Sequence, residues 1–239
     1  MDRTDLLLWL AVQEDVGHSD VTTEAIIDPL MAGRVSVFGR EPFVLSGSAP
    51  FRKVFNLIDP GIEISSFFRD GERIDANMPV FRLEGNIRSL LKGERTALNL
   101  LQRLSGIATL TRLMVEAMAG TSCRLLDTRK TTPLWRVLEK EAVVHGGGNN
   151  HRFGLFDGVL IKDNHVAAVG GVGEAVRRAR QRVPHTLKVE VEIDELQDLK
   201  GALAAGVDVV LLDNFSIEDM KAAVTMTAGR CLLEASGGV

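Results

Sequence analysis

Cationic side chains recur in three short polar segments of the sequence, and together they favour the binding of an anion. Arg129 and Lys130 lie in DTRKTTP, His151 and Arg152 follow a glycine run in GGGNNHR, and Lys162 lies in VLIKDNH. Arginine presents a planar fork that pairs with carboxylate or phosphate, and lysine adds a compact charge. Glycines allow backbone N–H groups to approach an anion closely. If folding brings these segments together, they form a pocket for carboxylates or phosphates.

Acidic side chains stand at or near the ends of later apolar runs. Glu190 and Glu192 lie in VEVE, Asp213 ends LLD, and Glu234 lies in LEASGG. Glu190 and Glu192 are two residues apart, so both side chains point to the same face of a strand. In a site for a phosphorylated sugar, carboxylates can hold ribose hydroxyls or a magnesium ion. A structural pairing with Lys188 or with another buried cation is the alternative for either glutamate.

Further residues extend the candidate site. Arg95, in GERTALN, adds a sixth cation to the set. Ser236, Gly237 and Gly238 end LEASGG, where small residues allow backbone amides to cradle a phosphate. His165 follows LIKDN, and a hydrogen bond that shapes this loop is as compatible with its position as a catalytic role.

The spacing of apolar residues predicts the elements that must position these groups. Short β-like runs separated by turn signals fill the first part of the chain and indicate a small α+β domain. Helical spacing then continues from Ile87, with a break expected at Ser105-Gly106. Beyond it, strands alternate with helices, which is typical of a parallel sheet with crossover helices, open or closed as a barrel. We predict one domain over residues 1–98 and a second over residues 99–239.

The expected parallel strands share a feature at their carboxyl ends. They cover residues 123–128, 158–163, 186–192, 208–213 and 231–236. Nearly all of them end in charged or small polar residues. In barrel enzymes the carboxyl ends of the strands form one rim of the barrel, and this rim carries the active site. Solvation of loops is the alternative explanation, but it does not require acid and base to recur at successive strand ends. We therefore expect the cations and carboxylates to face one cleft.

Composition limits the compartment and the partners. The net charge of −4 argues against a nucleic-acid binder. The longest N-terminal apolar run, residues 6–12, is far shorter than the ~20 residues that span a bilayer. Cys123 and Cys231 fit inert buried thiols in a reducing compartment, and the sequence lacks the Cys/His spacing of a zinc site. We expect a cytoplasmic protein with no membrane or nucleic-acid partner.

Seven segments, in chain order, resemble those of the quinolinate phosphoribosyltransferases, also called nicotinate-nucleotide pyrophosphorylases (carboxylating). They are EDVGHSDVTT, GERTALNLLQRLSGIAT, DTRKTTP, LEKEAVVHGGGNNHRFGLFDGVLIKDNH, VEVE, LLDN and LEASGG. The resemblance implies an α/β fold with an N-terminal α+β sandwich-like domain and an incomplete parallel α/β barrel that carries the active site. Members of this family continue beyond LEASGG with another βα unit. We therefore expect a C-terminally truncated chain that lacks part of the phosphate site.

The resemblance also implies an enzymatic activity. Such a pentosyltransferase converts quinolinate and phosphoribosyl pyrophosphate to nicotinate mononucleotide, pyrophosphate and carbon dioxide, with magnesium, in the de novo synthesis of NAD. By motif, Arg129, His151, Arg152 and Lys162 would surround the carboxylates of quinolinate. Arg95 would reach into the site of a neighbouring subunit, because the family forms homodimers or higher homo-oligomers.

The remaining residues take their implied roles from the same motifs. Lys130 would meet quinolinate or the phosphates, while Glu192 and Asp213 would serve the ribose hydroxyls and the metal. Lys130, Lys162, Glu192 and Asp213 are thus the expected catalytic residues. Ser236, Gly237 and Gly238 would begin the 5′-phosphate site.

Three alternatives stay open at this point. Two are relatives of the same architecture, a nicotinate phosphoribosyltransferase and a paralogue linked to molybdenum-transport operons. The set of Arg129, His151, Arg152 and Lys162 favours a dicarboxylate over nicotinate, because a monocarboxylate would leave buried cations unpaired. The third alternative is an inactive fragment that only binds anions.

Overall fold

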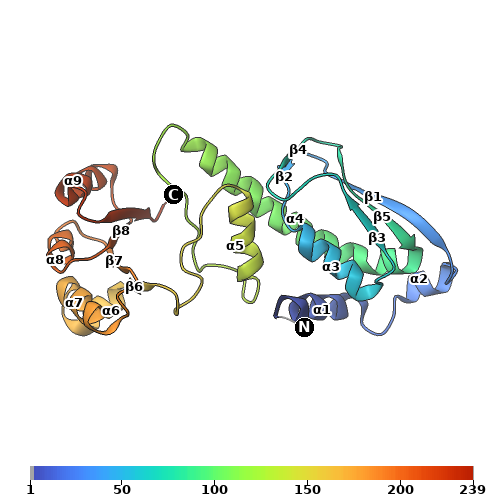
Figure 1. Cartoon of the computed structure of the whole chain (residues 1–239), viewed down its shortest axis with the longest axis horizontal. Coiled ribbons are helices and arrows are strands. Elements are labelled where there is room, and N and C mark those ends of the chain that lie inside the picture. Colours follow the sequence, from blue (N-terminus) through green and yellow to red (C-terminus); the bar gives the residue numbers. More distant parts are fainter. Residues whose placement is uncertain (1–2, 239) are drawn as a thin grey trace. The chain divides into compact units, whose positions relative to one another are not determined.

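The computed structural model describes residues 3–238, and the contacts divide the chain into two compact units, residues 1–151 and 152–239 (Figure 1). The predicted boundary between residues 98 and 99 falls inside a long helix, α4 (Ile87–Ala117). That domain boundary stays a prediction. None of the described helices is both long and apolar enough to cross a membrane.

The first unit contains two antiparallel sheets and several helices, which confirms the predicted α+β domain. The three-stranded sheet has the order β1-β5-β3, and β2 pairs with β4. The strands are β1 (Ala32–Phe38), β2 (Phe43–Val44), β3 (Glu63–Ser66), β4 (Arg73–Ile74) and β5 (Pro79–Asn86). The helices before α4 are α1 (Arg3–Val16), α2 (Val21–Ile26) and α3 (Ser48–Ile58).

Aromatic packing joins α3 to the three-stranded sheet. Phe51, Val54 and Phe55 recur at helical spacing and are all buried. The Phe51 ring stacks on Phe81 of β5 with 4.5 Å between centroids, and it meets Phe55 edge-on at 5.2 Å. The apolar face of α3 therefore fixes this helix on the sheet.

Helix α4 runs through 31 residues without interruption, so the expected break at Ser105-Gly106 is wrong. Asn86 caps its start by accepting from the backbone N–H groups of Arg88 and Ser89. Ser105 is buried, and its hydroxyl bonds both the N–H and the carbonyl of Ser46 at 3.1 Å. These contacts and a continuous buried stripe outweigh the ~1 kcal/mol helix penalty of one glycine.

The expected strand at 123–128 is also wrong. Among the described residues of that segment, only Leu126 forms a β-bridge, a parallel one with Asn149. The opposing chain is the glycine run, where Gly147 has a φ of 94° and cannot continue an extended strand. Cys123 consequently lies exposed rather than buried, while Cys231 is half-buried, and both thiols are free.

Helix α5 (Arg136–His145) supports the basic segment 127–133 through polar side chains on one helix face. Glu139 is buried, and it accepts from the Thr132 N–H at 3.0 Å and from the Thr132 hydroxyl at 2.7 Å. Arg103 of α4 donates to the same carboxylate at 2.6 Å. Burial raises the pKa of Glu139, but these hydrogen bonds and the Arg103 charge outweigh it and hold the pKa below its ordinary value.

The second unit is a four-stranded parallel sheet in the order β6-β7-β8-β9, which confirms the predicted parallel α/β architecture. Its strands are β6 (Val159–Ile161), β7 (Val189–Ile193), β8 (Val209–Asp213) and β9 (Leu232–Ser236). The helices α6 (Asp163–Val169), α7 (Val172–Arg182), α8 (Asp198–Ala204) and α9 (Ile217–Thr227) alternate with them. Figure 1 shows these helices gathered on one side of the sheet.

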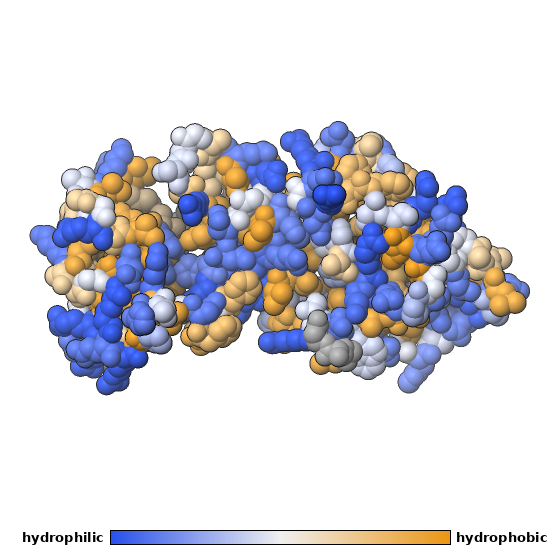
Figure 2. Space-filling model, viewed as in Figure 1, coloured by the Kyte–Doolittle hydropathy of each residue, from blue (hydrophilic) through white to orange (hydrophobic). Residues whose placement is uncertain are grey.

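The faces of α7 show why the helices lie there. Val172, Ala175 and Val176 are buried against the sheet, in one core with Val191 and Leu212. Exposed arginines cover the opposite side of the helix, where the surface is strongly hydrophilic (Figure 2, lower left). This core holds the strand ends in register, and the site depends on that register.

Close packing of α4 on α5 yields a first prediction. A Cβ at Gly146 would lie 2.5 Å from both the Ala108 carbonyl oxygen and Thr111 Cβ. Gly146→Ala should therefore lower the free energy of unfolding by about 1–3 kcal/mol, measured by urea denaturation. Gly106→Ala is the control, because a Cβ there meets nothing within 4 Å and alanine is the better helix former by ~0.5–1 kcal/mol. Equal stability of the two variants would contradict the packing.

The bonds of the Glu139 carboxylate to Thr132 and Arg103, here called the Glu139 clamp, yield a second prediction. Because the folded chain lowers its pKa, the stability from Glu139 is complete above about pH 4.5 and is lost as the pH falls through the folded-state pKa. Glu139→Gln should therefore lower the free energy of unfolding by roughly 1–3 kcal/mol at pH 7. The difference from the parent chain should shrink steadily below pH 4.5, where the carboxylate of the parent becomes protonated. A difference independent of pH would rule out a charged clamp.

Candidate functional site

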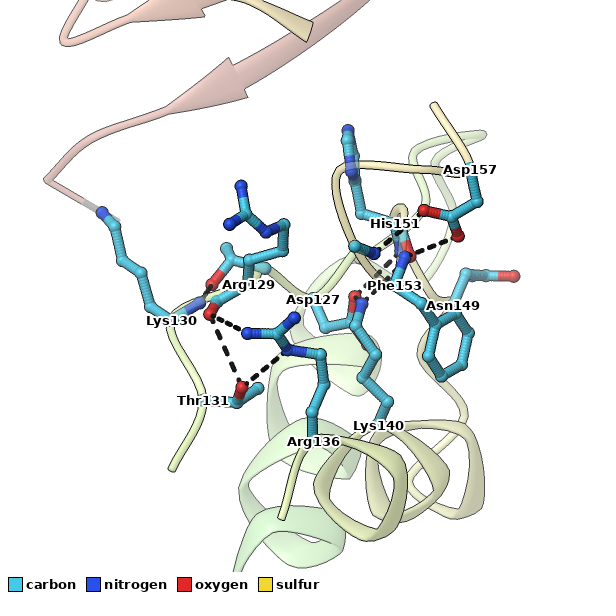
Figure 3. A network of polar contacts seen from close by, with 12 residues as sticks. Asp127, Arg129, Lys130, Thr131, Arg136, Lys140, Asn149, His151, Phe153 and Asp157 are labelled. Atoms are coloured by element: carbon cyan, nitrogen blue, oxygen red, sulfur yellow. Dashed lines mark hydrogen bonds and ion pairs between the residues drawn. The ribbon is translucent and has the colours of Figure 1, made fainter. Parts of the chain in front are cut away.

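In the first unit, the basic segment 127–133, from here on called the basic loop, lies next to α5 and is hydrogen-bonded to that helix (Figure 3). Arg136 donates to the Thr131 hydroxyl at 3.0 Å and to the Arg129 carbonyl at 3.4 Å. The Lys130 N–H donates to the Thr128 hydroxyl oxygen at 2.9 Å. On the side of Arg129 and Lys130, these bonds involve only backbone groups, so the charged ends of these two side chains take no part in them.

Arg129 and Lys130 differ in exposure. Lys130 is exposed, whereas Arg129 is half-buried. The Nε of Arg129 is buried and has no hydrogen-bond partner in the described part of the chain. A buried N–H without a partner is costly, so a ligand oxygen that accepted from it would be favoured.

A buried ion pair, which the sequence did not suggest, lies beneath this loop. The Lys140 side chain is 0% exposed and that of Asp127 is 7% exposed, and the ammonium donates to Asp127 Oδ1. The same carboxylate oxygen accepts the His151 N–H at 2.8 Å. The pair therefore joins the start of the basic loop to His151. The available signal was a lysine between Leu138 and Ala142 on a helix face that the core should cover.

Arg95 is separate from this group within the chain. It is exposed on α4, which contacts the basic loop through Arg103, eight residues further along the helix. Eight residues correspond to ~12 Å of helix. Within the first unit, the structure thus joins the segments that bear Arg129 and His151, and Arg95 is not part of this group.

In the second unit, the parallel register gathers the predicted strand-end residues on the sheet face opposite the buried valines of β7. Ile161 pairs with Val191, so Lys162 follows beside Glu192, and its ammonium lies 2.7 Å from Glu192 Oε2. Glu192 pairs with Leu211 of β8, and Asp213 pairs with Ser236 of β9. The expectation that charged strand ends converge is confirmed within this unit.

An acidic cavity of about 120 Å³ opens among these strand ends. Glu192 and Asp213 line it together with Asp163, Asp194 and Asp198. Only oxygen donors are offered by these side chains, and this is the ligand type that magnesium prefers. Glu190 is buried on β7, two residues before Glu192, and it does not line this cavity.

The loop before β6 carries Arg152. Its guanidinium donates to the Gly158 carbonyl at 3.0 Å, which folds the loop back on itself. Asp157 accepts from the N–H groups of Gly154 and Phe153 at 2.9 and 2.8 Å, and these bonds lower the pKa of its carboxyl. The bend thus holds Arg152 near the first residue of β6.

Two local structures fix the remaining predicted residues. His165 Nδ1 accepts the Lys162 N–H at 2.9 Å, so His165 shapes the turn into α6, one of its two expected roles. Gly237 has a φ of 88°, and a Cβ there would lie 2.1 Å from Asn214 Oδ1. Only glycine fits there, and the Asn214 N–H completes the turn by donating to the Ser236 carbonyl at 2.8 Å.

Models of one protein family match nearly the whole chain. Residues 20–105 match the family model described as "Quinolinate phosphoribosyl transferase, N-terminal domain", and residues 107–239 match the corresponding C-terminal domain model.

Curated proteins and solved structures are also similar to the chain. The "probable nicotinate-nucleotide pyrophosphorylase [carboxylating]" of Bacillus subtilis is 40% identical over 226 residues, which cover 95% of this chain and 78% of the relative. The solved structure of NadC from Streptococcus pyogenes is 45% identical with a TM-score of 0.94, and the match covers 98% of this chain and 83% of the other.

A third match is the nicotinate-nucleotide pyrophosphorylase from Francisella tularensis, which is 40% identical with a TM-score of 0.95 and covers 100% of this chain and 84% of the other. Both domain models and these identities lead to one conclusion: the chain belongs to the quinolinate phosphoribosyltransferase family.

Proposed function

We propose that the chain transfers a phosphoribosyl group from phosphoribosyl pyrophosphate to quinolinate. The products are nicotinate mononucleotide, pyrophosphate and carbon dioxide, and the reaction is a step in the de novo synthesis of NAD. The observation that carries this proposal is the family match over residues 20–105 and 107–239, on a chain that carries Arg129, His151, Arg152 and Lys162.

The charges of the substrates explain the cationic residues. Quinolinate carries two carboxylates, and phosphoribosyl pyrophosphate carries a 5′-phosphate and a diphosphate. By motif, we assign Arg129, His151, Arg152 and Lys162 to the quinolinate carboxylates. Lys130 is exposed on its loop and serves quinolinate or a phosphate. Quinolinate offers these cations one more carboxylate than nicotinate does, so we expect quinolinate to be the preferred substrate.

The carboxylates act on the sugar. Displacement at the anomeric carbon builds positive charge on the ribose ring, so a fixed carboxylate stabilises the transition state more than the ground state. Glu192 and Asp213 stand on neighbouring strands and are held there by the sheet. Loss of the carboxylate next to the ring nitrogen needs little acid–base chemistry. Positioning and exclusion of water therefore supply most of the rate.

The acidic cavity fits a magnesium ion. Its lining offers five carboxylates and no soft ligand, as Asp163, Glu192, Asp194, Asp198 and Asp213 show. Lys162 already binds Oε2 of Glu192, so Oε1 of Glu192 and the carboxylate of Asp213 are the oxygens we assign to the metal. When bound, magnesium neutralises charge on the pyrophosphate leaving group.

The site also involves a second subunit in our proposal. Arg95 is exposed on α4 and forms no ion pair with any described residue. We assign it to the site of a neighbouring copy in a homodimer or larger homo-oligomer. The two free thiols agree with a reducing compartment, and we place the enzyme in the cytoplasm.

Substitution of two cations tests the quinolinate site. Arg129→Ala and Lys162→Ala should each raise the Kd for quinolinate at least ~10-fold, because each removes a charged partner of a carboxylate worth ~1.5–3 kcal/mol. Isothermal titration calorimetry measures this change. Lys200→Ala is the matched control, since Lys200 is exposed on α8 and does not line the cavity. An unchanged Kd in either test variant would remove that residue from the site.

The choice of substrate tests the activity itself. With magnesium present, the protein should release pyrophosphate from phosphoribosyl pyrophosphate at least ~100-fold faster when quinolinate is the acceptor than when nicotinate is, and with quinolinate it should also release carbon dioxide. Chelation of magnesium should abolish turnover. Turnover of nicotinate but not quinolinate would point to the nicotinate-specific relative, and binding of quinolinate without turnover would point to an inactive anion-binding protein.

A further inference from the structure

The Asp127–Lys140 ion pair is tied to the backbone at His151 on both sides of that residue. Asp127 Oδ1 accepts the His151 N–H at 2.8 Å, and the Lys140 ammonium donates to the His151 carbonyl at 3.0 Å. The amide of Asn150, oriented with its nitrogen toward the pair, donates to Asp127 Oδ2 at 2.6 Å and to the Lys140 carbonyl at 3.0 Å. Two peptide groups that flank His151 are therefore held by one buried pair.

The same pair anchors the basic loop. Asp127 is two residues before Arg129, and its N–H donates to the Asn149 carbonyl at 3.1 Å. Asn149 donates in turn to the Leu125 carbonyl at 2.8 Å. These bonds replace the absent strand and join the chain at Leu125–Asp127 to the chain at Asn149–His151. Figure 3 shows Lys140 reaching from α5 to Asp127 and to the His151 backbone.

Lys140 cannot itself contact a ligand, because its side chain is fully buried. Nor does stability alone account for it, since a buried ion pair is often no more stable than apolar side chains of the same volume. Its particular capacity is geometric. An ammonium can donate to a carboxylate and to a carbonyl at once, which no apolar side chain can do.

We propose that Asp127 and Lys140 are positioning residues that fix the backbone of Arg129 and His151 before an anion binds. Preorganised cations bind more tightly than mobile ones, because the cost of ordering the loops is met during folding. The identity of the anion as quinolinate rests on the proposed function. The positioning role rests on the geometry of the first unit alone.

Paired substitutions separate positioning from stability. Lys140→Met alone leaves Asp127 buried without its cation, so both folding and binding should suffer. The double variant Lys140→Met with Asp127→Asn has no buried charge, and the asparagine carbonyl can still accept the His151 N–H. We expect its melting temperature to lie close to that of the parent, while its Kd for quinolinate stays at least ~10-fold higher.

The control is Lys53→Met, which breaks a partly buried ion pair with Asp5 elsewhere in the first unit. Its Kd for quinolinate should stay within about twofold of the parent value. Recovery of both stability and quinolinate affinity in the double variant would overturn the proposal, because the pair would then act only by neutralising charge.

Amide exchange of the unmodified protein decides the matter if the variants do not fold. The His151 N–H should exchange at least ~100-fold more slowly than in an unstructured peptide without any ligand, and quinolinate should slow it little further. Exchange at the unstructured rate until quinolinate is added would overturn the proposal. A protected His151 amide in a protein that does not bind quinolinate would refute the proposed function and leave the positioning role standing.

Discussion

A buried ammonium needs a carboxylate and further acceptors, and in this protein that requirement organises the candidate site residues of the first unit. Lys140 meets it with Asp127 and with the carbonyl of His151. Because the buried Lys140 ammonium must be paired, its bonds to Asp127 and to the His151 carbonyl hold together the two chain segments that bear Arg129 and His151. Glu139, the preceding residue of the helix, fixes Thr132 in the same way. Helix α5 thus sets the geometry of a loop that has no regular structure of its own.

A different constraint organises the second unit. Parallel pairing allows side chains of neighbouring strands to share a face only in a fixed register, and the helix-covered face is filled by apolar residues such as Val191 and Leu212. Glu192 must consequently point to the other face. Lys162 follows β6 at the matching position and meets it at 2.7 Å. The carboxylates of this unit are thus placed by the sheet, whereas the cations of the first unit are placed by loops.

The parallel sheet could be predicted from the sequence because apolar strand-like runs alternate with helical segments along the chain, and the polar strand ends could be predicted with it. The loops could not. Residues 123–128 have the composition of a strand, but their partner is a glycine run that offers one bridge. Gly106 lies next to a serine and resembles a helix break, yet Ser105 is held by Ser46, which is distant in the chain. Lys140 has no local signal of its partner, because Asp127 lies thirteen residues away.

These two forms of support match what the proposed reaction asks of each group. Carboxylates that stabilise charge developing on a ribose ring must already be in place when that charge appears, and a strand end supplies this rigidity. Cations that receive a planar dicarboxylate need correct spacing on loops, which are mobile unless they are anchored. Here the anchors are buried polar contacts of Lys140 and Glu139 instead of apolar packing. Because hydrogen bonds specify direction as well as distance, such anchors fix the orientation of Arg129 and His151 more narrowly than a hydrophobic contact would.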